Sequence, residues 1–364
     1  MSAHLRRQIG QLVVSGFSGT EVPVELRALA REFDLGGIIL FARNIEAPTQ
    51  VAELAYDLRR LTGELPPWVS VDQEGGRVQR LKAPGTVWPP VSTLGRSGDP
   101  RLTERFARAL ARELRAVGIT LDYAPVLDVD TNPRNPVIGD RAISGDFQDV
   151  AALGSLIVRT LQCEGIAACG KHFPGHGDTS VDSHENLPVV ELDADRLREV
   201  EFEPFRSAIT ADVAALMVAH VTYPSLDEAS PATLSAPVVA GVLRQELGFS
   251  GLIVTDDMEM GAIAKHYDVV DASVKAVTAG CDMLLLCGTD QVRQMEIIEG
   301  LIYALEEGTL SERRVEDAVK RQRHVKARFL SNDPDWRPPT ARELQLLLGR
   351  AEHQEVAAEM RRQL

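Results

Sequence analysis

Gly165-Ile166-Ala167-Ala168-Cys169-Gly170-Lys171-His172-Phe173-Pro174-Gly175-His176-Gly177 is the stretch of sequence that decides the fold. Residues 165–170 are small and apolar, which is typical of a strand buried on both faces of a parallel sheet. Residues 171–177 cannot form a regular helix, because Pro174 lacks an amide donor and glycine weakens helices. A titratable loop directly after a buried strand is where parallel α/β proteins place their active sites. The stretch therefore predicts an α/β enzyme with a parallel sheet.

Apolar runs of the same kind recur along the chain, separated by stretches with helical periodicity. We expect strands near 12–17, 36–41, 68–72, 119–128, 166–171, 214–220, 251–256 and 282–287. Helices are expected at 48–61, 101–117, 236–247, 291–307 and 310–329, and at 193–210, where Pro204 splits the helix. Eight strands alternating with helices predict a single-domain (β/α)8 barrel of the TIM type over residues 1–331. A doubly wound open sheet is the alternative, but it gives no reason for eight strands. Residues 332–364 are expected to supply a linker (334–339) and one amphipathic helix (340–364) on or beside the barrel.

Composition and charge indicate which partners, compartment and cofactors to expect. The chain of 364 residues has a formal net charge of −14, which argues against nucleic acid and anionic membranes, because both select for basic surfaces. No apolar run is long enough to span a membrane, and the first residues lack the apolar core of a signal peptide. The four cysteines lie in or beside apolar runs without zinc-ligand spacing, which favours buried thiols in a reducing compartment. A cytoplasmic monomer without metal or other cofactor is therefore expected.

Titratable residues stand at the carboxyl ends of five different predicted strands. They are Asp72, Asp128, Lys171 with His172, His220, and Asp256 with Asp257. In a barrel these strand ends converge on one mouth, where active sites lie. The pattern therefore predicts one shared polar site.

The predicted mouth has the groups that glycoside hydrolysis needs. One group must protonate the leaving oxygen, and another must attack or stabilise the anomeric carbon. Asp256 and Asp257 offer the carboxylate, and Asp182-Ser183-His184 offers an imidazole with a carboxylate two residues away. Because successive side chains of a strand point to opposite faces, only one of the two aspartates is expected to enter the mouth. The other then serves as a helix cap or a backbone anchor.

Four motifs carry a resemblance to a known family. They are Val71-Asp72-Gln73-Glu74-Gly75-Gly76-Arg77-Val78-Gln79-Arg80, Ile138-Gly139-Asp140-Arg141, Lys171-His172-Phe173-Pro174-Gly175-His176-Gly177 with Asp182-Ser183-His184, and Val254-Thr255-Asp256-Asp257-Met258-Glu259-Met260. In order and spacing, from about Gln8 to Cys287, the chain resembles glycoside hydrolase family 3, specifically the single-domain NagZ type of bacterial β-N-acetylglucosaminidase. The third motif separates N-acetylglucosaminidases from glucosidases of that family.

This resemblance implies a retaining exo-hydrolase that forms a covalent glycosyl-enzyme intermediate. It implies Asp256 as the nucleophile and His184 as the general acid/base, with Asp182 as the partner of the imidazole. The substrate would be a muropeptide fragment carrying a terminal β-linked N-acetylglucosamine on anhydro-N-acetylmuramic acid, cleaved during peptidoglycan recycling. The sugar would be bound through its hydroxyls and acetamido group by Asp72, Arg80, Arg141, Lys171 and His172.

Several of these side chains also have structural interpretations. Arg80 could be a surface arginine, and Asp128 could cap the following turn. His176, between two glycines, is interpreted as holding the loop, while His220 could contact sugar or be a satisfied core histidine. His172 and His176 have the spacing of a metal pair, but that spacing forms a site only on one helix turn, which Pro174 prevents. The glycines at 75 and 76 lack the remaining residues of a phosphate-binding loop.

Three other functions compete with covalent hydrolysis. One aspartate could orient the acetamido group as an internal nucleophile, but His184 would then have no task. A phosphorylase could use the same site, because a neutral histidine does not repel incoming phosphate as a carboxylate does. A non-catalytic sugar-binding barrel would not need a complete acid/base and nucleophile set.

Overall fold

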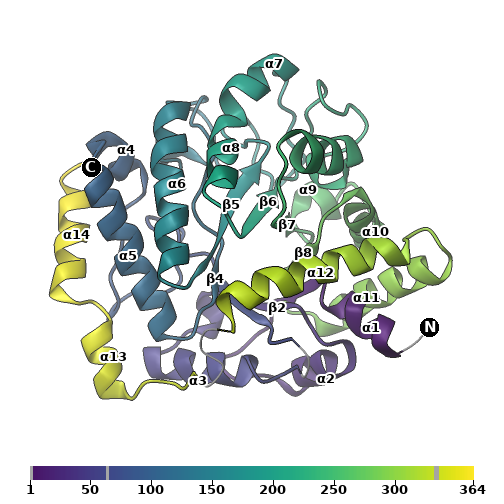
Figure 1. Cartoon of the computed structure of the whole chain (residues 1–364), viewed down its shortest axis with the longest axis horizontal. Coiled ribbons are helices and arrows are strands. Elements are labelled where there is room, and N and C mark those ends of the chain that lie inside the picture. The colour runs from purple at the N-terminus through teal and green to yellow at the C-terminus, as the bar shows by residue number, and fades with distance from the viewer. Residues whose placement is uncertain (1–2, 63–64, 332–335) are drawn as a thin grey trace.

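Eight parallel strands close into a barrel in chain order, with helices around it (Figure 1). The computed structural model describes residues 3–62, 65–331 and 336–364. The strands are β1 Val13–Ser15, β2 Gly37–Leu40, β3 Trp68–Val71, β4 Leu121–Asp122, β5 Ala167–Phe173, β6 Ala215–Val218, β7 Leu252–Asp257 and β8 Met283–Leu286. The predicted (β/α)8 barrel is therefore confirmed.

One predicted strand is much shorter than the apolar run that indicated it. A strand was expected over 119–128, but β4 covers only Leu121–Asp122. Pro125 has no amide to donate to a neighbouring strand. Beyond β4 the chain keeps single backbone hydrogen bonds to its neighbours, from the Tyr123 amide to the Val71 carbonyl and from the Cys169 amide to the Ala124 carbonyl, and an isolated bridge between Val126 and Lys171. The freed segment leads towards Asp128 at the mouth.

The barrel interior is packed with side chains from alternate strand positions. Val14, Ile39, Trp68 and Tyr123 belong to one buried apolar cluster with residues of the other strands. Residues with the opposite orientation, such as Ile38, pack in the larger core between the strands and the helices. A filled interior is usual for an eight-stranded barrel, so a ligand is confined to the mouth.

Helix is present in every segment predicted as helical. The helices are α1 Ala3–Gly10, α2 Val24–Phe33, α3 Pro48–Leu58, α4 Ser92–Ser97, α5 Pro100–Ala116, α6 Phe147–Cys163, α7 Ala194–Arg196, α8 Glu203–Thr210, α9 Gly261–Ala264, α10 Val269–Ala279, α11 Gln291–Glu306, α12 Glu312–Phe329, α13 Ala341–Leu347 and α14 Ala351–Arg361. Of these, α1, α2, α4, α6, α9 and α10 were not predicted. The predicted helix over 193–210 is split as expected, with π-helical η3 Leu197–Glu201 before α8, whose first turn holds Pro204. The segment predicted as 236–247 is π-helical η5 Pro237–Glu246. No helix in the described part of the chain is long and apolar enough to cross a membrane.

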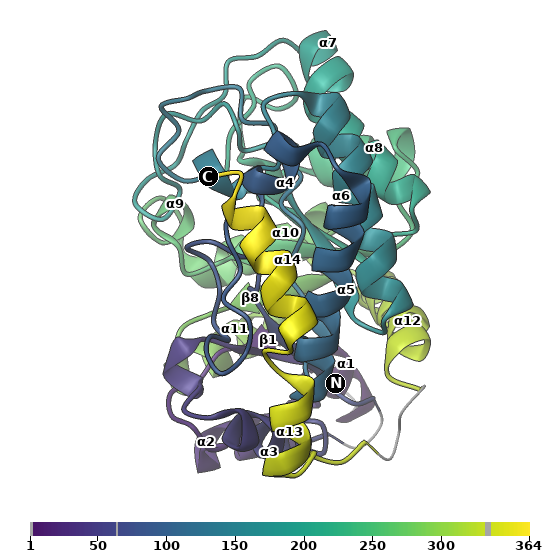
Figure 2. The same cartoon turned by 90° about the vertical axis from the view of Figure 1, so that its left-hand side faces the viewer.

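The C-terminal segment corrects one prediction. A single helix was expected over 340–364, but α13 and α14 are separate. Gly349 stands between them with φ +58°, and a Cβ there would lie 2.2 Å from the carbonyl oxygen of Pro84. Only glycine readily adopts this φ and leaves room for the Pro84 carbonyl. The left-handed backbone at Gly349 interrupts the helix, and the chain turns there. Figure 2 shows α14 lying along α5. Of the linker predicted over 334–339, residues 334–335 lie outside the described residues, and 336–339 have no regular structure.

Helix α12 closes the end of the barrel opposite the mouth. Trp68 Nε1 donates to Gln322 Oε1 over 3.1 Å, and Gln322 Nε2 donates to the carbonyl of Gln11. Lys326 Nζ donates to Gln11 Oε1 over 2.9 Å, with only 2% of Lys326 exposed. The segment before β1 and helix α12 are thus joined through buried polar contacts.

Candidate active site

A cavity of about 230 Å³ opens at the carboxyl ends of the strands. All five residues expected to bind the sugar line it, together with both catalytic candidates of the mouth: Asp72, Arg80, Arg141, Lys171, His172, His184 and Asp256. Asp182 does not line the cavity but contacts His184. The structure therefore brings the predicted site residues together in one place.

A buried carboxylate that the sequence analysis did not assign to the site organises the sugar-binding candidates. Glu74 accepts two hydrogen bonds of 2.9 Å from Arg141, and Lys171 Nζ lies 2.6 Å from its Oε1. Lys171 also lies 2.8 Å from Asp72, whose other oxygen accepts from Arg80 over 3.3 Å. Burial alone would raise the pKa of Glu74, but the two cations hold it well below its usual range. One available signal was spacing, since Glu74 lies two residues after Asp72 at a strand end.

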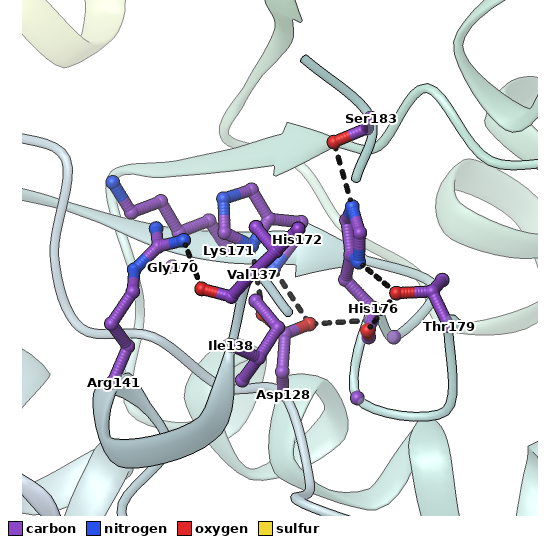
Figure 3. A network of polar contacts seen from close by, with 12 residues as sticks. Asp128, Val137, Ile138, Arg141, Gly170, Lys171, His172, His176, Thr179 and Ser183 are labelled. Carbon is purple, nitrogen blue, oxygen red and sulfur yellow. Dashed lines mark hydrogen bonds and ion pairs between the residues drawn. The ribbon is translucent and has the colours of Figure 1, made fainter. Parts of the chain in front are cut away.

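Asp128 orients a histidine rather than capping a turn. Its Oδ2 lies 2.7 Å from His172 Nδ1, and its Oδ1 accepts from the amides of His172 and His176 (Figure 3). Burial would raise the pKa of Asp128, but the His172 imidazole lowers it below its usual value. An ionised Asp128 makes Nδ1 the donor, so Nε2 of His172 is left for a ligand in the cavity.

His176 is held by hydroxyl groups, in agreement with its structural interpretation. Its Nδ1 lies 2.8 Å from Thr179 Oγ1, and its Nε2 lies 2.9 Å from Ser183 Oγ (Figure 3). Burial and the neighbouring His172 lower the pKa of His176 to about 4. Among the described residues, no group of three or more His, Cys, Asp or Glu side chains is arranged to hold a metal ion.

The two aspartates at the end of β7 have different environments. Asp256 Oδ1 accepts the amide of Asp257 over 2.8 Å; burial would raise its pKa, but His172 and His220 lower it. Asp257 Oδ1 accepts from the amides of Glu259 and Cys287, and burial raises the pKa of Asp257 to about 7. Asp257 is therefore the expected backbone anchor.

The expectation that only one aspartate enters the mouth is wrong. Both Asp256 and Asp257 line the cavity. The register of β7 against β8 shifts between Val254 and Asp257, and such an irregularity interrupts the strict alternation of side chains.

His220, whose role the sequence left open, and His184, the expected acid/base, lie in contrasting positions. His220 is fully buried, with Nδ1 2.9 Å from Thr233 Oγ1 and Nε2 2.9 Å from the Asp257 carbonyl. It is a satisfied core histidine. His184 has 64% of its side chain exposed, and its Nδ1 lies 2.8 Å from Asp182 Oδ1. Burial would raise the pKa of Asp182, but hydrogen bonds from the His184 amide and ring lower it.

An aromatic wall completes the cavity. The Phe41 ring lines it, with the guanidinium carbons of Arg43 and Arg80 at 4.4 and 5.2 Å from the ring centroid. These distances are within the range of cation–π contacts. Phe41 follows β2 directly, but an apolar residue at a strand end gave no chemical signal in the sequence.

Comparison with known proteins decides the family. The profile described as the N-terminal domain of glycosyl hydrolase family 3 matches residues 4–325. The chain belongs to this family. It is 42% identical to the β-hexosaminidase of Methylobacillus flagellatus over 275 residues, which are 74% of this chain and 78% of that protein. The β-hexosaminidase A of Pseudoalteromonas piscicida is longer: it is 34% identical, and the match spans 85% of this chain and 56% of that protein.

Solved structures of the family share the fold. A glycoside hydrolase family 3 β-N-acetylglucosaminidase from Paenibacillus sp. str. FPU-7 superposes with a TM-score of 0.94 at 41% identity, covering 99% of this chain and 68% of that one. NagZ from Neisseria gonorrhoeae, in complex with N-trifluoroacetyl-D-glucosamine, gives 0.78 at 29% identity, covering 97% and 98%. The predicted glycoside hydrolase of family 3 is confirmed.

Proposed function

We propose that this family 3 hydrolase is a retaining exo-β-N-acetylglucosaminidase that works through a covalent glycosyl–Asp256 intermediate. One observation carries the proposal: Asp256, whose pKa the nearby imidazoles of His172 and His220 lower, lines the same small cavity as His184. The exposed His184 ring is in turn held by Asp182 at 2.8 Å. The cavity is smaller than the roughly 300–1,000 Å³ of pockets for drug-sized ligands, and Met217 and Leu285 of the packed barrel line it. These features support cleavage of one terminal sugar.

The proposed reaction has two steps. In the first, a carboxylate oxygen of Asp256 forms a bond to the anomeric carbon, the glycosidic bond breaks, and the proton of His184 passes to the leaving oxygen. In the second, His184 takes a proton from water, the water oxygen bonds to the anomeric carbon, and the bond to Asp256 breaks. Two displacements return the sugar with its original β configuration.

We further propose that the charged cluster binds the sugar. Asp72, Arg80, Arg141, Lys171 and His172 would hydrogen-bond its hydroxyls and acetamido group, with Asp182 orienting the acid/base. Buried pairing supports this assignment, because Lys171 and Arg141 are held by Glu74 in fixed geometry. The apolar ring of Phe41 would cover the remaining face of the sugar.

A muropeptide fragment is the proposed natural substrate, with N-acetylglucosamine β-linked to anhydro-N-acetylmuramic acid. The motif of residues 171–177 with Asp182-Ser183-His184 and the structural likeness to NagZ of Neisseria gonorrhoeae support this proposal. A cytoplasmic location, a monomeric state and a role in peptidoglycan recycling stay predictions.

The test is an assay of 4-nitrophenyl β-N-acetylglucosaminide with and without inorganic phosphate, identifying the first sugar product by NMR. We expect β-N-acetylglucosamine in both reactions. N-acetylglucosamine 1-phosphate would instead identify a phosphorylase, and an α product would exclude retention. A slow fluorinated glycoside should label Asp256 in the wild-type enzyme; labelling of Asp257 would overturn the assignment of the nucleophile.

A further inference from the structure

A buried serine separates the two exposed residues of the proposed acid/base pair. Ser183 has 1% of its surface exposed and is the single buried residue between positions 180 and 187. The side chains of Asp182 and His184 are 33% and 64% exposed. Burying a hydroxyl group costs free energy unless it is hydrogen-bonded, so the contacts of Ser183 indicate what this position does.

The hydroxyl group of Ser183 donates to a neutral imidazole. Thr179 Oγ1 donates its proton to the carbonyl of His176 over 3.1 Å, so at 2.8 Å it accepts from Nδ1 of the same residue. Nε2 of His176 is then unprotonated and accepts from Ser183 Oγ over 2.9 Å (Figure 3). The lowered pKa of His176, about 4, keeps this arrangement neutral near pH 7. The amide of His176 is fixed in turn by Asp128 over 2.7 Å.

The backbone on both sides of the acid/base is held by helix α9. The carbonyl of Ser183 accepts from the amide of Ala262 over 3.1 Å, and the carbonyl of His184 accepts from the amide of Gly261 over 3.2 Å. A Cβ at position 261 would lie 2.5 Å from the His184 oxygen. Only glycine therefore lets α9 approach the loop this closely.

We propose that Ser183 is a positioning residue for the acid/base, held by His176 of the loop after β5 and by the first amides of α9. Ser183 also lines the cavity, so direct contact with the sugar is the alternative that the test separates from positioning. The proposal rests on the proposed function, because the role assigned to Ser183 is exercised through His184. Its hydroxyl fixes the loop at the residue between Asp182 and His184, so the exposed imidazole keeps its place beside the cavity without a buried contact of its own.

The test compares Ser183→Ala with Ser180→Ala, an exposed serine of the same loop. The substrates are N,N′-diacetylchitobiose, whose leaving group needs a proton, and 4-nitrophenyl β-N-acetylglucosaminide, whose leaving group barely does. We expect Ser183→Ala to lower kcat/KM at least about tenfold for chitobiose and less than about threefold for the nitrophenyl glycoside. Ser180→Ala should change neither. Equal losses on both substrates, or no loss on chitobiose, would overturn the proposal.

A double-mutant cycle separates this proposal from the proposed function. If Ser183 acts through His184, adding Ser183→Ala to His184→Ala should lower kcat/KM on chitobiose no further. Additive losses contradict the positioning role. If His184→Ala alone lowers kcat/KM equally on both substrates, the acid/base assignment itself fails. If His184→Ala lowers kcat/KM mainly on chitobiose but Ser183→Ala lowers it equally on both substrates, only the positioning role of Ser183 is rejected.

A second variant reaches the same loop from the other side. Gly261→Ala should displace the His184 carbonyl and produce the same selective loss on chitobiose. Gly241→Ala is the control, because its Cβ would lie 3.9 Å from the carbonyl oxygen of Ala236, an ordinary van der Waals contact. An unchanged ratio of the two kcat/KM values in Gly261→Ala would overturn the proposal even if Ser183→Ala does not fold.

Discussion

Asp256 and Asp257 are adjacent carboxylates with opposite ionisation preferences. Asp256 faces the imidazoles of His172 and His220, which favour its charged form, whereas Asp257 is buried beside the negative charges of Glu259 and Asp256. A nucleophile must be ionised, while an anchor needs only oxygens that accept backbone amides. These environments favour Asp256 over Asp257 as the proposed nucleophile.

The first prediction concerns Asp257→Asn, which keeps an oxygen for the amides of Glu259 and Cys287. The folded pKa of about 7 lies above the ordinary value of 3.8, so the stabilising effect of the protonated carboxyl is complete below pH 4 and is lost as pH rises towards 7. The variant cannot ionise. At pH 8 we expect its unfolding free energy, measured by urea titration, to exceed that of wild type by up to a few kcal/mol. At pH 4 we expect no difference. A difference independent of pH would show that Asp257 is not protonated in the folded state.

The second prediction concerns Glu74→Gln. Removing one buried charge leaves Arg141 and Lys171 short of a counterion, and breaking a buried pair costs about 3–5 kcal/mol. We expect a fall of this size in unfolding free energy from urea titration. We also expect a loss of at least about tenfold in kcat/KM on nitrophenyl and natural glycosides alike, because sugar binding, not proton transfer, is affected. The exposed Glu53→Gln on α3 is the control; equal behaviour of the two variants would remove Glu74 from the site.

At the scale of elements, the sequence predicted the order of strands better than their ends. Continuous apolar runs identify strands buried on both faces, which is why all eight were located. Their limits depend on hydrogen bonding: Pro125 ends β4 early, and the irregularity in β7 places both aspartates at the mouth. Gly349 divided the last helix because of a contact with Pro84 that no local pattern encodes.

The third prediction concerns the attachment of α14 to α5. His353 Nδ1 lies 2.8 Å from Glu113 Oε1, which also accepts from the amide of Gly349. Burial would raise the pKa of Glu113, but hydrogen bonds from His353 and Thr86 lower it. His353→Ala should therefore cost about 1–3 kcal/mol of unfolding free energy, because a buried carboxylate loses a partner.

Hydrogen exchange provides the measurement of local attachment. In His353→Ala the amides of α14 should exchange faster than in wild type, while those of β5 keep their protection. Glu355→Ala, an exposed position of the same helix, is the matched control. Unchanged exchange in α14 would show that apolar packing alone holds the helix.

At the scale of the whole molecule, the first and last segments of the barrel meet at Lys326. Burial lowers its pKa to about 7, although the charge of Asp34 opposes this effect. Because the folded pKa lies below the ordinary value of 10.5, the unfolding free energy increases as pH rises from 7 to 10.5. Below pH 7 the folded protein bears the full cost of burying the charged ammonium group.

The fourth prediction follows for Lys326→Met, a change of similar volume. We expect it to raise unfolding free energy at pH 6 by up to about 5 kcal/mol, less the contribution of the lost hydrogen bond, since each pKa unit corresponds to about 1.4 kcal/mol. The gain should vanish by pH 10.5, where the variant lacks only the hydrogen bond to Gln11. Urea titrations at both pH values provide the measurement. A variant that is less stable at pH 6 would show that the ammonium group is well compensated in the folded protein.

The candidate site was predictable where titratable residues directly follow predicted strands. Titratable residues after five strands, combined with barrel topology, predicted a shared polar mouth, and Asp72, Lys171, His172, Asp256 and Asp257 of that set line the cavity, whereas Asp128 and His220 do not. Arg80 and Arg141 were expected there only from the resemblance to the family. The supporting side chains were not predictable in the same way. Glu74, Phe41 and the hydroxyl groups around His176 act through contacts between distant segments, and a single sequence carries no record of which segments meet.

The circular order of the strands also governs how the protein can be made. Val13 of β1 pairs with Leu284 of β8, so the sheet cannot close until almost the whole barrel has left the ribosome. At about 5–20 residues per second, synthesis of that length takes roughly ten seconds to one minute. Throughout that time both edges of the growing sheet present unpaired amides and carbonyls to other chains. The yield of this enzyme in a cell should therefore depend on translation speed and chaperone supply as much as on the stability of the finished barrel.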